Sequence, residues 1–382
     1  MTTGKALNGK PYAGNPHVRF DEGEVASAAM PRRGSLLYRS LQALKLFAFV
    51  PLAALALVCT SCVDAETSSL GGGGAGTAKA ETAAATVRVG SYNIRTPQGD
   101  RNTPNAWDAR KADMVELMRR IDFDVVGLQE VCPDQAAYIT NALPQFMMVG
   151  EFRNADRKSG EASPVCYRAD RFEVLKSGTF WLSKTPEVPG SKSWGTACTR
   201  ICTWAILKDC RTGSSFCFAN THTDHISELA RKEGMLLIIR RMREFAPAGT
   251  PVVFTGDHNC RETEAPSIAV SKLLKNALYI SETPPAGAWR SFSGWEWRDR
   301  EYSAVDALKL PLNVRNARKG SPDATKKNGK HVWEDCGRRI DYIYVSDGVR
   351  VKSYATHTDA RPGKKLYPSD HFPLSAVVQF AK

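Results

Sequence analysis

Short apolar segments of strand length recur along this chain, and several of them end at a polar side chain. Examples are "DVVGLQEV" and "PVVFTGDHN", while "CTWAILKDC" and "SSFCFANTHTDH" have the pattern of an antiparallel hairpin. Two other segments, "NAWDARKADMVELMRRI" and "ISELARKEGMLLIIRRMREF", have the apolar spacing of amphipathic helices. Hairpins mixed with strand–helix–strand units favour an α/β protein in which two sheets pack together with helices outside.

The polar residues near these strand boundaries are carboxylates, amides and histidines, which are common in catalytic and metal-binding sites. The set comprises Asn93, Glu130, His222, Asp257 and Asn259 at strand ends, Asp341 within an alternating strand, and Asp370 and His371 just before the last strand. One such residue alone is most often a turn or cap residue. Eight such residues, seven at strand boundaries and one within a strand, predict a functional site at one edge of the sheets.

The acids and the amide of this set suit a hard metal ion. Carboxylates of Glu130 and Asp370, with the amide oxygen of Asn93, are ligands preferred by Mg²⁺ or Mn²⁺, whereas zinc favours nitrogen and sulfur. Mg²⁺ keeps several waters and takes one or two carboxylates beside a substrate phosphate. A sparse acid set is therefore what a phosphate-cleaving magnesium site requires.

The histidine next to Asp370 needs an orienting carboxylate if it is to act as a base or to carry charge near a phosphate. Asp341 is the candidate partner of His371, because its strand alternation separates it from its apolar neighbours. The alternative for Asp341 is an ion pair with Arg338 or Arg339.

Six motifs stand in the order of one known superfamily: "SYNIR", "GLQEV", "NTHTDH", "TGDHN", "RRIDYIYVS" and "SDHFP". Residues 87–382 resemble the endonuclease/exonuclease/phosphatase superfamily, which includes deoxyribonucleases, repair nucleases, deadenylases, sphingomyelinases and inositol-polyphosphate phosphatases. The resemblance implies a four-layer α/β sandwich, in which two packed mixed β-sheets are flanked by helices. It also implies a metal-dependent phosphoesterase.

The resemblance assigns roles to the metal-binding half of the site. Glu130 is similar to the principal metal ligand, with Asn93 beside it and Asp370 contributing. His371, oriented by Asp341, is similar to the histidine that activates water or stabilises the phosphate.

The resemblance also assigns residues to nucleophile and substrate. Asp257 and Asn259 match the pair that positions the nucleophile, and whether Asp257 or the histidine of "SDHFP" is the base stays open. His222 matches a phosphate contact or proton donor. The further residues expected to contact the substrate are Tyr167, Arg168 and Asn220.

Three features depart from the family pattern or extend it. His258 stands where an aromatic residue or leucine is usual, so an extra site histidine is one interpretation. The basic stretch "NVRNARKGSPDATKKNGK" is either a clamp for a polyanion or a solvated surface insertion. The tryptophans of "AWRSFSGWEWRD" either stack on bases or pack within the protein.

The expected activity is Mg²⁺-dependent phosphodiester hydrolysis, with Mn²⁺ as the alternative metal. The expected substrate is nucleic acid, cleaved by metal-assisted attack of water on phosphorus. Two alternatives stay open: the same chemistry on phospholipid head groups or on sugar or inositol phosphates, and a surface lipoprotein that binds without cleaving. We expect a monomer. No Gly-rich phosphate loop is present in the sequence, so ATP use is not expected.

The N-terminal part has the composition of an export signal. Residues 30–62 place a basic region before the apolar stretch Leu46–Val58, followed by small residues up to Cys62. The stretch is shorter than the roughly 20 residues of a membrane span. The pattern predicts a lipid anchor at Cys62, with a cleaved secretory signal or an uncleaved anchor as alternatives. Because Met30 opens this signal, residues 1–29 are interpreted as a mis-assigned start or an extension.

Residues 63–86, rich in Gly, Ala, Ser and Thr, are expected to be a flexible linker to the domain at 87–382. Residues 1–61 carry seven Lys or Arg and three Asp or Glu, so their removal lowers the formal charge from +12 to +8. This moderately basic charge suits a phosphate-bearing substrate. In an exported protein Cys210 and Cys217 would pair if a two-residue turn set them opposite each other; two free thiols are the alternative.

Overall fold

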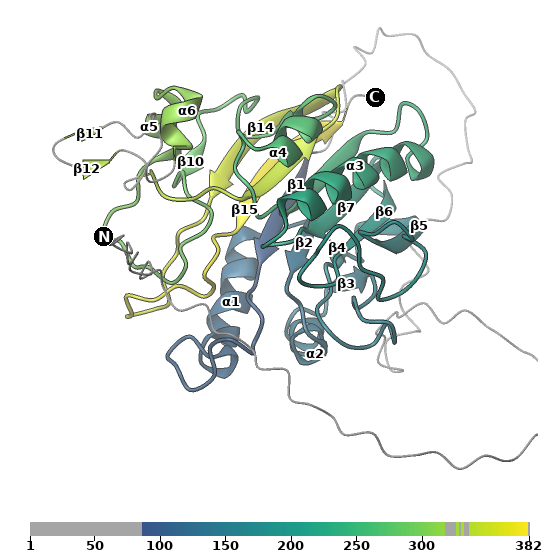
Figure 1. The fold of residues 1–382 in the computed structure, drawn as a ribbon, viewed down its shortest axis with the longest axis horizontal. Helices are drawn as coiled ribbons and strands as arrows, with labels where there is room; N and C mark the ends of the chain where they lie inside the picture. The colour runs from purple at the N-terminus through teal and green to yellow at the C-terminus, as the bar shows by residue number, and fades with distance from the viewer. Residues whose placement is uncertain (1–85, 318–325, 328–329, 332–335, 381–382) are drawn as a thin grey trace, which may run out of the picture. The chain divides into compact units, whose positions relative to one another are not determined.

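Two mixed β-sheets form the centre of the protein, and helices lie outside them (Figure 1). The computed structural model describes residues 86–317, 326–327, 330–331 and 336–380. The four-layer sandwich expected from the sequence is confirmed. The expected extension, the signal segment and its anchor, and all but the last residue of the expected linker lie outside the described residues.

The first sheet has seven strands in the order β10-β14-β15-β1-β2-β4-β3. Its β1 and β2 are parallel, and β15 runs antiparallel to β1. The strands are β1 (Thr86–Asn93), β2 (Val125–Gln129), β3 (Phe146–Val149), β4 (Val165–Arg168), β10 (Ala286–Gly287), β14 (Val349–Thr356) and β15 (Leu374–Phe380).

The second sheet has six strands in the order β5-β6-β7-β8-β13-β9. Its parallel pair is β7 with β8, and β13 runs antiparallel to β8. The strands are β5 (Phe172–Trp181), β6 (Ile201–Asp209), β7 (Ser215–His222), β8 (Val252–Asp257), β9 (Lys275–Asn276) and β13 (Asp341–Val345). A separate small pair joins β11 (Lys326–Lys327) to β12 (Lys330–His331).

The helices are α1 (Trp107–Ile121), α2 (Pro133–Ala142), α3 (Glu228–Phe245), α4 (Ala265–Ser271), α5 (Ala304–Leu308) and α6 (Leu312–Arg315). Their boundaries follow local sequence signals. Asp122 ends α1 in the left-handed conformation, with φ of 57°. Ser227 begins α3, and its side chain accepts a hydrogen bond from the backbone N–H of Ala230.

Three apolar layers hold the sandwich together. The central layer takes side chains from both sheets, including Val89, Phe218 and Ile343. A second layer joins α1 and α2 to the outer face of the first sheet. A third joins α3 and α4 to the second sheet, as Figure 1 also shows. Burial of these layers supplies the main driving force for the fold.

The strand register brings the predicted polar residues to one edge. Asn93 is paired with Gln129 at the ends of β1 and β2, and His222 with Asp257 at the ends of β7 and β8. Asp341, the first residue of β13, is paired with Asp257. The two parallel pairs therefore end where the antiparallel β13 begins, and this shared edge assembles the site.

The hairpin of β6 and β7 corrects the expected cysteine pairing. Cys217 lies opposite Ile206 in the register, and β6 ends at Asp209, before Cys210. The turn covers residues 210–214 instead of two residues, so the two thiols do not face each other. Within the described ranges, no helix is both long enough and apolar enough to cross a bilayer.

Candidate active site

Glu130 follows β2 and has a backbone φ of 63°, in the left-handed region that a non-glycine residue seldom adopts. Its Oε1 accepts a hydrogen bond from Asn93 Nδ2 at 2.9 Å, and its Oε2 accepts one from Thr96 N at 2.7 Å. Burial opposes its ionisation, but Arg95 and these hydrogen bonds hold the pKa of Glu130 below its usual range. The site therefore keeps this carboxylate charged.

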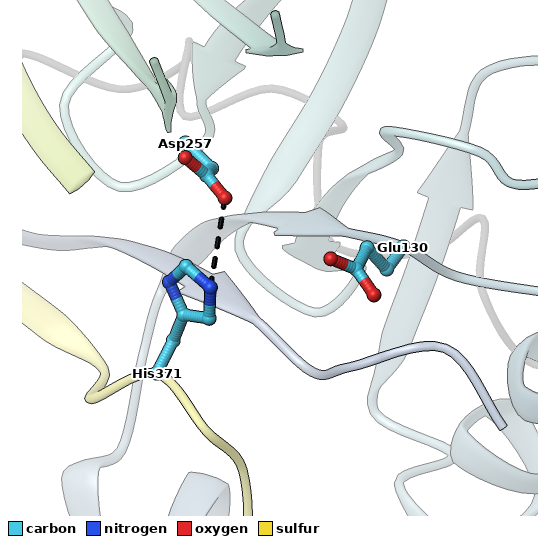
Figure 2. A group of neighbouring side chains, drawn as sticks. All are labelled: Glu130, Asp257 and His371. Atoms are coloured by element: carbon cyan, nitrogen blue, oxygen red, sulfur yellow. Dashed lines mark ion pairs between the residues drawn. The ribbon is translucent and has the colours of Figure 1, made fainter. Parts of the chain in front are cut away.

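His371 lies between the carboxylates of Asp341 and Asp257. Figure 2 shows its ring facing Asp257, with the Glu130 carboxylate on another side of the group. Its Nδ1 is 2.9 Å from Asp341 Oδ2, and its Nε2 is 3.6 Å from Asp257 Oδ2. Ser291 Oγ donates a hydrogen bond to the same Asp341 oxygen at 2.7 Å. Burial disfavours the charged ring, but Asp341 and then Asp257 outweigh it and raise the pKa of His371 to about 10. The imidazole is therefore a cation at neutral pH.

Asp257, at the end of β8, accepts hydrogen bonds from Asn93 Nδ2 at 3.0 Å and from the backbone N–H of Asn259 at 2.9 Å. Burial and the neighbouring Asp341 raise the pKa of Asp257 to about 7. This carboxyl group can therefore take up and release a proton near neutral pH.

His222 ends β7 beside Asp257. Its Nε2 lies 2.9 Å from Asn259 Nδ2 and 3.4 Å from Asp257 Oδ2. Burial, with Arg200 and Arg153 nearby, holds the pKa of His222 well below 6.5. The two histidines of the site thus differ in charge, because His222 is neutral whereas His371 is protonated.

Asp370 lies beside Arg95, with 3.6 Å between Oδ2 and Nη1. Burial raises the pKa of Asp370, with repulsion from Glu130 adding to it, while the His371 and Arg95 charges oppose the change. The carboxylates of Asp370 and Glu130 are therefore close enough to repel each other, although the two residues lie in different loops.

The donor set fits a divalent cation. Glu130, Asp257 and His371 present ligand atoms within 4.8 Å of one another (Figure 2). Because the His371 ring is protonated and Asp257 can hold a proton near neutral pH, the carboxylate of Glu130, with Asp370 nearby, is the suitable ligand. Several buried carboxylates in one place are costly unless positive charge offsets them. Hard oxygen donors of this kind suit Mg²⁺ or Mn²⁺.

The orientation of Asn93 differs from the prediction. Its Oδ1 accepts a hydrogen bond from the backbone N–H of Arg95 at 3.0 Å, which fixes which end of the amide is oxygen. Its Nδ2 therefore points to Glu130 and Asp257. In this structure Asn93 therefore positions the carboxylates of Glu130 and Asp257 by hydrogen bonds. Its amide oxygen points away from them and is not placed to bind a metal ion beside them.

Tyr167 and Arg168 lie away from the site, so their predicted role in substrate binding is wrong. They end β4, which runs antiparallel to β2 and pairs Tyr167 with Val125 at the start of that strand. The site begins at Glu130, about 16 Å further along at strand geometry. Arg168 instead forms ion pairs with Asp122 and Asp170 on the surface.

Asn220 joins the two sheets and is wrongly predicted as a substrate contact. Its Nδ2 donates to the carbonyl oxygens of Leu128 at 2.7 Å and Pro164 at 3.0 Å, and its Oδ1 accepts from Gln129 Nε2 at 2.7 Å. The side chain is completely buried and fully hydrogen-bonded. The sheets approach so closely here that a Cβ on Gly127 would lie 2.5 Å from Asn220 Oδ1.

His258 and Trp289, which belong to two of the three other features noted in the sequence, pack within the protein. His258 is completely buried among the rings of Phe254, Tyr342 and Tyr344, so it is not a site residue. Trp289, in the tryptophan-rich stretch, is completely buried as well. Most of the basic insertion lies outside the described residues.

Three residues of the site were missed by sequence reasoning: Arg95, Thr96 and Ser291. Arg95 is the last residue of the quoted motif "SYNIR" and Thr96 follows it, so their position was visible although their role was not. Nothing in the sequence around Ser291 indicates that its hydroxyl would donate to Asp341.

A sheet sandwich that gathers buried carboxylates, a neutral histidine and a protonated histidine at one edge defines a metal-dependent phosphoesterase. Comparison of the sequence with family models agrees, because the Endonuclease/Exonuclease/phosphatase family matches residues 90–371. The chain therefore belongs to this family, and the family prediction is confirmed.

Solved structures of Bacteroides thetaiotaomicron and Bacteroides vulgatus are similar over most of this chain. A mannosyl-6-phosphatase of B. thetaiotaomicron is 30% identical with a TM-score of 0.64, covering 77% of this chain and 100% of that one. A family member from B. vulgatus is 30% identical with a TM-score of 0.64, covering 78% and 100%. Zebrafish (D. rerio) TDP2 with a single-strand DNA product is 15% identical with a TM-score of 0.53, covering 77% and 99%, which shows the shared fold alone.

An uncharacterized protein, R895, of Acanthamoeba polyphaga mimivirus is 25% identical over 153 residues, which are 36% of this chain. The chain spans about a fifth of that protein, or 21% of its length.

Proposed function

We propose that the protein hydrolyses phosphate esters with Mg²⁺. In this proposal a protonated His371 stabilises negative charge on the phosphate, and Asp257 accepts a proton from the attacking water. The observation that carries the proposal is the position of the His371 ring, between Asp341 and Asp257, with the Glu130 carboxylate on another side of the group. A fixed cation beside charged carboxylates suits stabilisation of the negative charge that develops on phosphorus oxygens.

The metal would be held by Glu130 and Asp370, with Asp257 at the other side of the group. When bound, Mg²⁺ would polarise a phosphoryl oxygen and offset its developing charge. Glu130 is prepared for this role because Asn93 and Thr96 fix both of its oxygens by hydrogen bonds. Mn²⁺ would serve in the same way.

Water is the nucleophile. As its oxygen bonds to phosphorus, one of its protons passes to Asp257, whose pKa of about 7 suits proton uptake near neutral pH. The phosphorus–oxygen ester bond breaks, and the departing alkoxide takes a proton from solvent. The His371 cation cannot accept this first proton at neutral pH, which is why we assign the base role to Asp257.

A sugar phosphate is one candidate substrate. The mannosyl-6-phosphatase that is 30% identical to this chain supports it, because it is similar over most of the chain and over its own whole length. This candidate is a monoester, unlike the diester expected from the sequence.

Nucleic acid is the second candidate, supported by a groove of about 210 Å³ beside His371. In the groove the Arg338 guanidinium lies 4.2 Å from the centre of the Phe292 ring, which in turn contacts the His371 ring at 4.8 Å. The groove is lined by Arg261, Arg290, Phe292, Ser293, Glu296, Arg298, Gly337 and Arg338. Glu296 pairs with Arg290 and Arg298, and the excess of arginine over acid suits a phosphate backbone.

The test is to incubate the full-length protein with Mg²⁺ or with EDTA and four substrates: plasmid DNA, single-stranded RNA, mannose 6-phosphate and bis-p-nitrophenyl phosphate. Cleavage of any of them that EDTA abolishes supports the proposed chemistry and identifies the substrate class. Cleavage that persists in EDTA contradicts it, and so does metal binding without any cleavage.

A further inference from the structure

A small hollow opens beside His222, next to the acid cluster. It measures about 10 Å³, roughly the space of one water-sized group. Its walls come from the β3–β4 connection, from the residues that precede β6, and from the end of β7. The polar residues that line it are Arg153, Glu161, Ser163, Thr199, Arg200 and His222.

Arg200 is buried in the wall of this hollow with little to neutralise it. The side chain is 6% exposed, and its Nη2 lies 3.1 Å from His225 Nδ1. Its Nε has no hydrogen-bond partner among the described residues, and Asp224 Oδ2 is 4.0 Å away. That oxygen already accepts a hydrogen bond from Thr196 Oγ1 at 2.8 Å. Arg200 therefore keeps hydrogen-bonding capacity for a group that enters the hollow.

His222 has a second unused polar atom. Its Nε2 is occupied by Asn259 at 2.9 Å and by Asp257 at 3.4 Å, whereas its Nδ1 is buried without a hydrogen-bond partner among the described residues. Buried polar atoms without partners are rare in folded proteins, and here two of them belong to residues that line the same hollow, so a polar group placed there could satisfy them.

The remaining charges in the wall largely offset each other. Arg153 Nη1 and Glu161 Oε2 form an ion pair at 2.5 Å. With this pair neutral, Arg200 is the remaining charged residue of the lining, and its nearest carboxylate, Asp224 at 4.0 Å, does not line the hollow. A group that enters it should therefore be an anionic oxygen.

We propose that Arg200 and His222 form a subsite for a terminal oxygen of the substrate phosphate, and that the site therefore prefers phosphate monoesters. The inference rests on the proposed function and narrows its substrate class. A monoester carries a third unsubstituted oxygen and a second negative charge, which this subsite receives. A diester would place an ester oxygen and its carbon chain there, and the hollow has no space for a chain.

The test compares Arg200→Gln with the wild-type full-length protein on p-nitrophenyl phosphate and on bis-p-nitrophenyl phosphate. Because a hydrogen bond to a charged group contributes about 1.5–3 kcal/mol, we expect kcat/KM for the monoester to fall about 10- to 100-fold. For the diester we expect a change of less than about threefold. Arg157→Gln is the matched control, since it removes the same charge from an exposed position that does not line the hollow.

Equal losses on both esters, or no loss on the monoester, would overturn the subsite. If the wild-type protein cleaves neither nitrophenyl ester, the four-substrate test above still decides the proposed function, and calorimetric binding of inorganic phosphate decides the subsite alone. Weaker phosphate binding by Arg200→Gln supports the subsite in that case, and equal binding overturns it. If Arg200→Gln does not fold, Arg200→Lys keeps the charge but loses the second donor, and we expect a smaller loss confined to the monoester.

Discussion

The Nδ1 atom of His371 lies 2.9 Å from Asp341 Oδ2, although 30 positions separate the two residues in the chain. Asp341 begins β13 and is paired with Asp257 at the end of β8, while His371 lies in the loop before β15. Asp341, on a strand of the second sheet, therefore orients His371, which lies in a loop leading to a strand of the first sheet. Packing of the two sheets thus assembles the catalytic pair.

Asp341→Asn should lower kcat by roughly 10²- to 10⁴-fold, because a neutral amide no longer stabilises the His371 cation. Since Asp341 and Asp257 raise the pKa of His371 to about 10, wild-type activity that needs the cation should decline only as the pH rises through that value. In the variant the alkaline decline should move to lower pH. A pH profile of kcat measures both effects.

Asp347→Asn is the control for this variant. It makes the same substitution just beyond the other end of β13, at an exposed residue paired with Lys275. Its activity and pH profile should match the wild type. An Asp341→Asn enzyme with an unchanged alkaline limb would contradict the assigned ion pair.

Glu130→Gln should weaken Mg²⁺ binding and reduce turnover at least about 100-fold, because it removes a charged ligand whose two oxygens are already oriented. Calorimetric titration with Mg²⁺ and with Mn²⁺ reports the binding, and EDTA should abolish wild-type activity. Glu116→Gln, on the exposed face of α1, is the control and should bind metal as the wild type does. Equal affinity of the Glu130 and Glu116 variants would remove Glu130 from the metal site.

The strand ends that carry the site were predictable, whereas the contacts that decide each role were not. Glu130 and Asp257 are visible in the sequence because each closes an apolar run, and such runs end at the same edge of parallel strands. The direction of β4 is set by antiparallel pairing with β2, which no local pattern encodes, so Arg168 was assigned to the wrong end. The hydrogen bonds of Asn220 depend on the distance between two sheets, and a sequence does not give that distance.

Arg168→Gln should leave kcat/KM within about twofold of the wild type, because its partners are surface aspartates at the far end of β2. The measurement is steady-state kinetics on whichever substrate the wild type cleaves. A loss above tenfold, without a change in thermal stability, would restore Arg168 to the substrate site.

Asn220→Ala should destabilise the protein by roughly 2–4 kcal/mol, because it removes three buried hydrogen bonds, to the carbonyl oxygens of Leu128 and Pro164 and from the Gln129 amide. Urea denaturation measures this loss. At temperatures where the variant is folded, its KM should stay near the wild-type value. A large rise in KM with normal stability would mean that Asn220 binds the substrate after all.

His258→Phe should stabilise the protein and reduce its sensitivity to acid. Burial lowers the pKa of His258 to about 3, and neither ring nitrogen has a hydrogen-bond partner among the described residues. Between pH 6.5 and about 3 the unfolded chain binds a proton that the folded chain does not, so stability falls as the pH drops through this range. Phenylalanine removes this loss and also removes two unsatisfied polar atoms from a cluster of aromatic rings.

Urea denaturation at pH 7.5 and at pH 5, each with the wild type beside it, should show the variant about 1–2 kcal/mol more stable at the higher pH. The difference in stability between the two proteins should widen at the lower pH, because only the unfolded wild-type chain has an imidazole at position 258 that takes up a proton. Activity separates this structural role from a catalytic one, since the ring contacts Phe254, Tyr342 and Tyr344 and no acid of the site. A stable variant without turnover would make His258 a site residue, and a variant less stable than the wild type would mean that the imidazole has a partner that phenylalanine cannot replace.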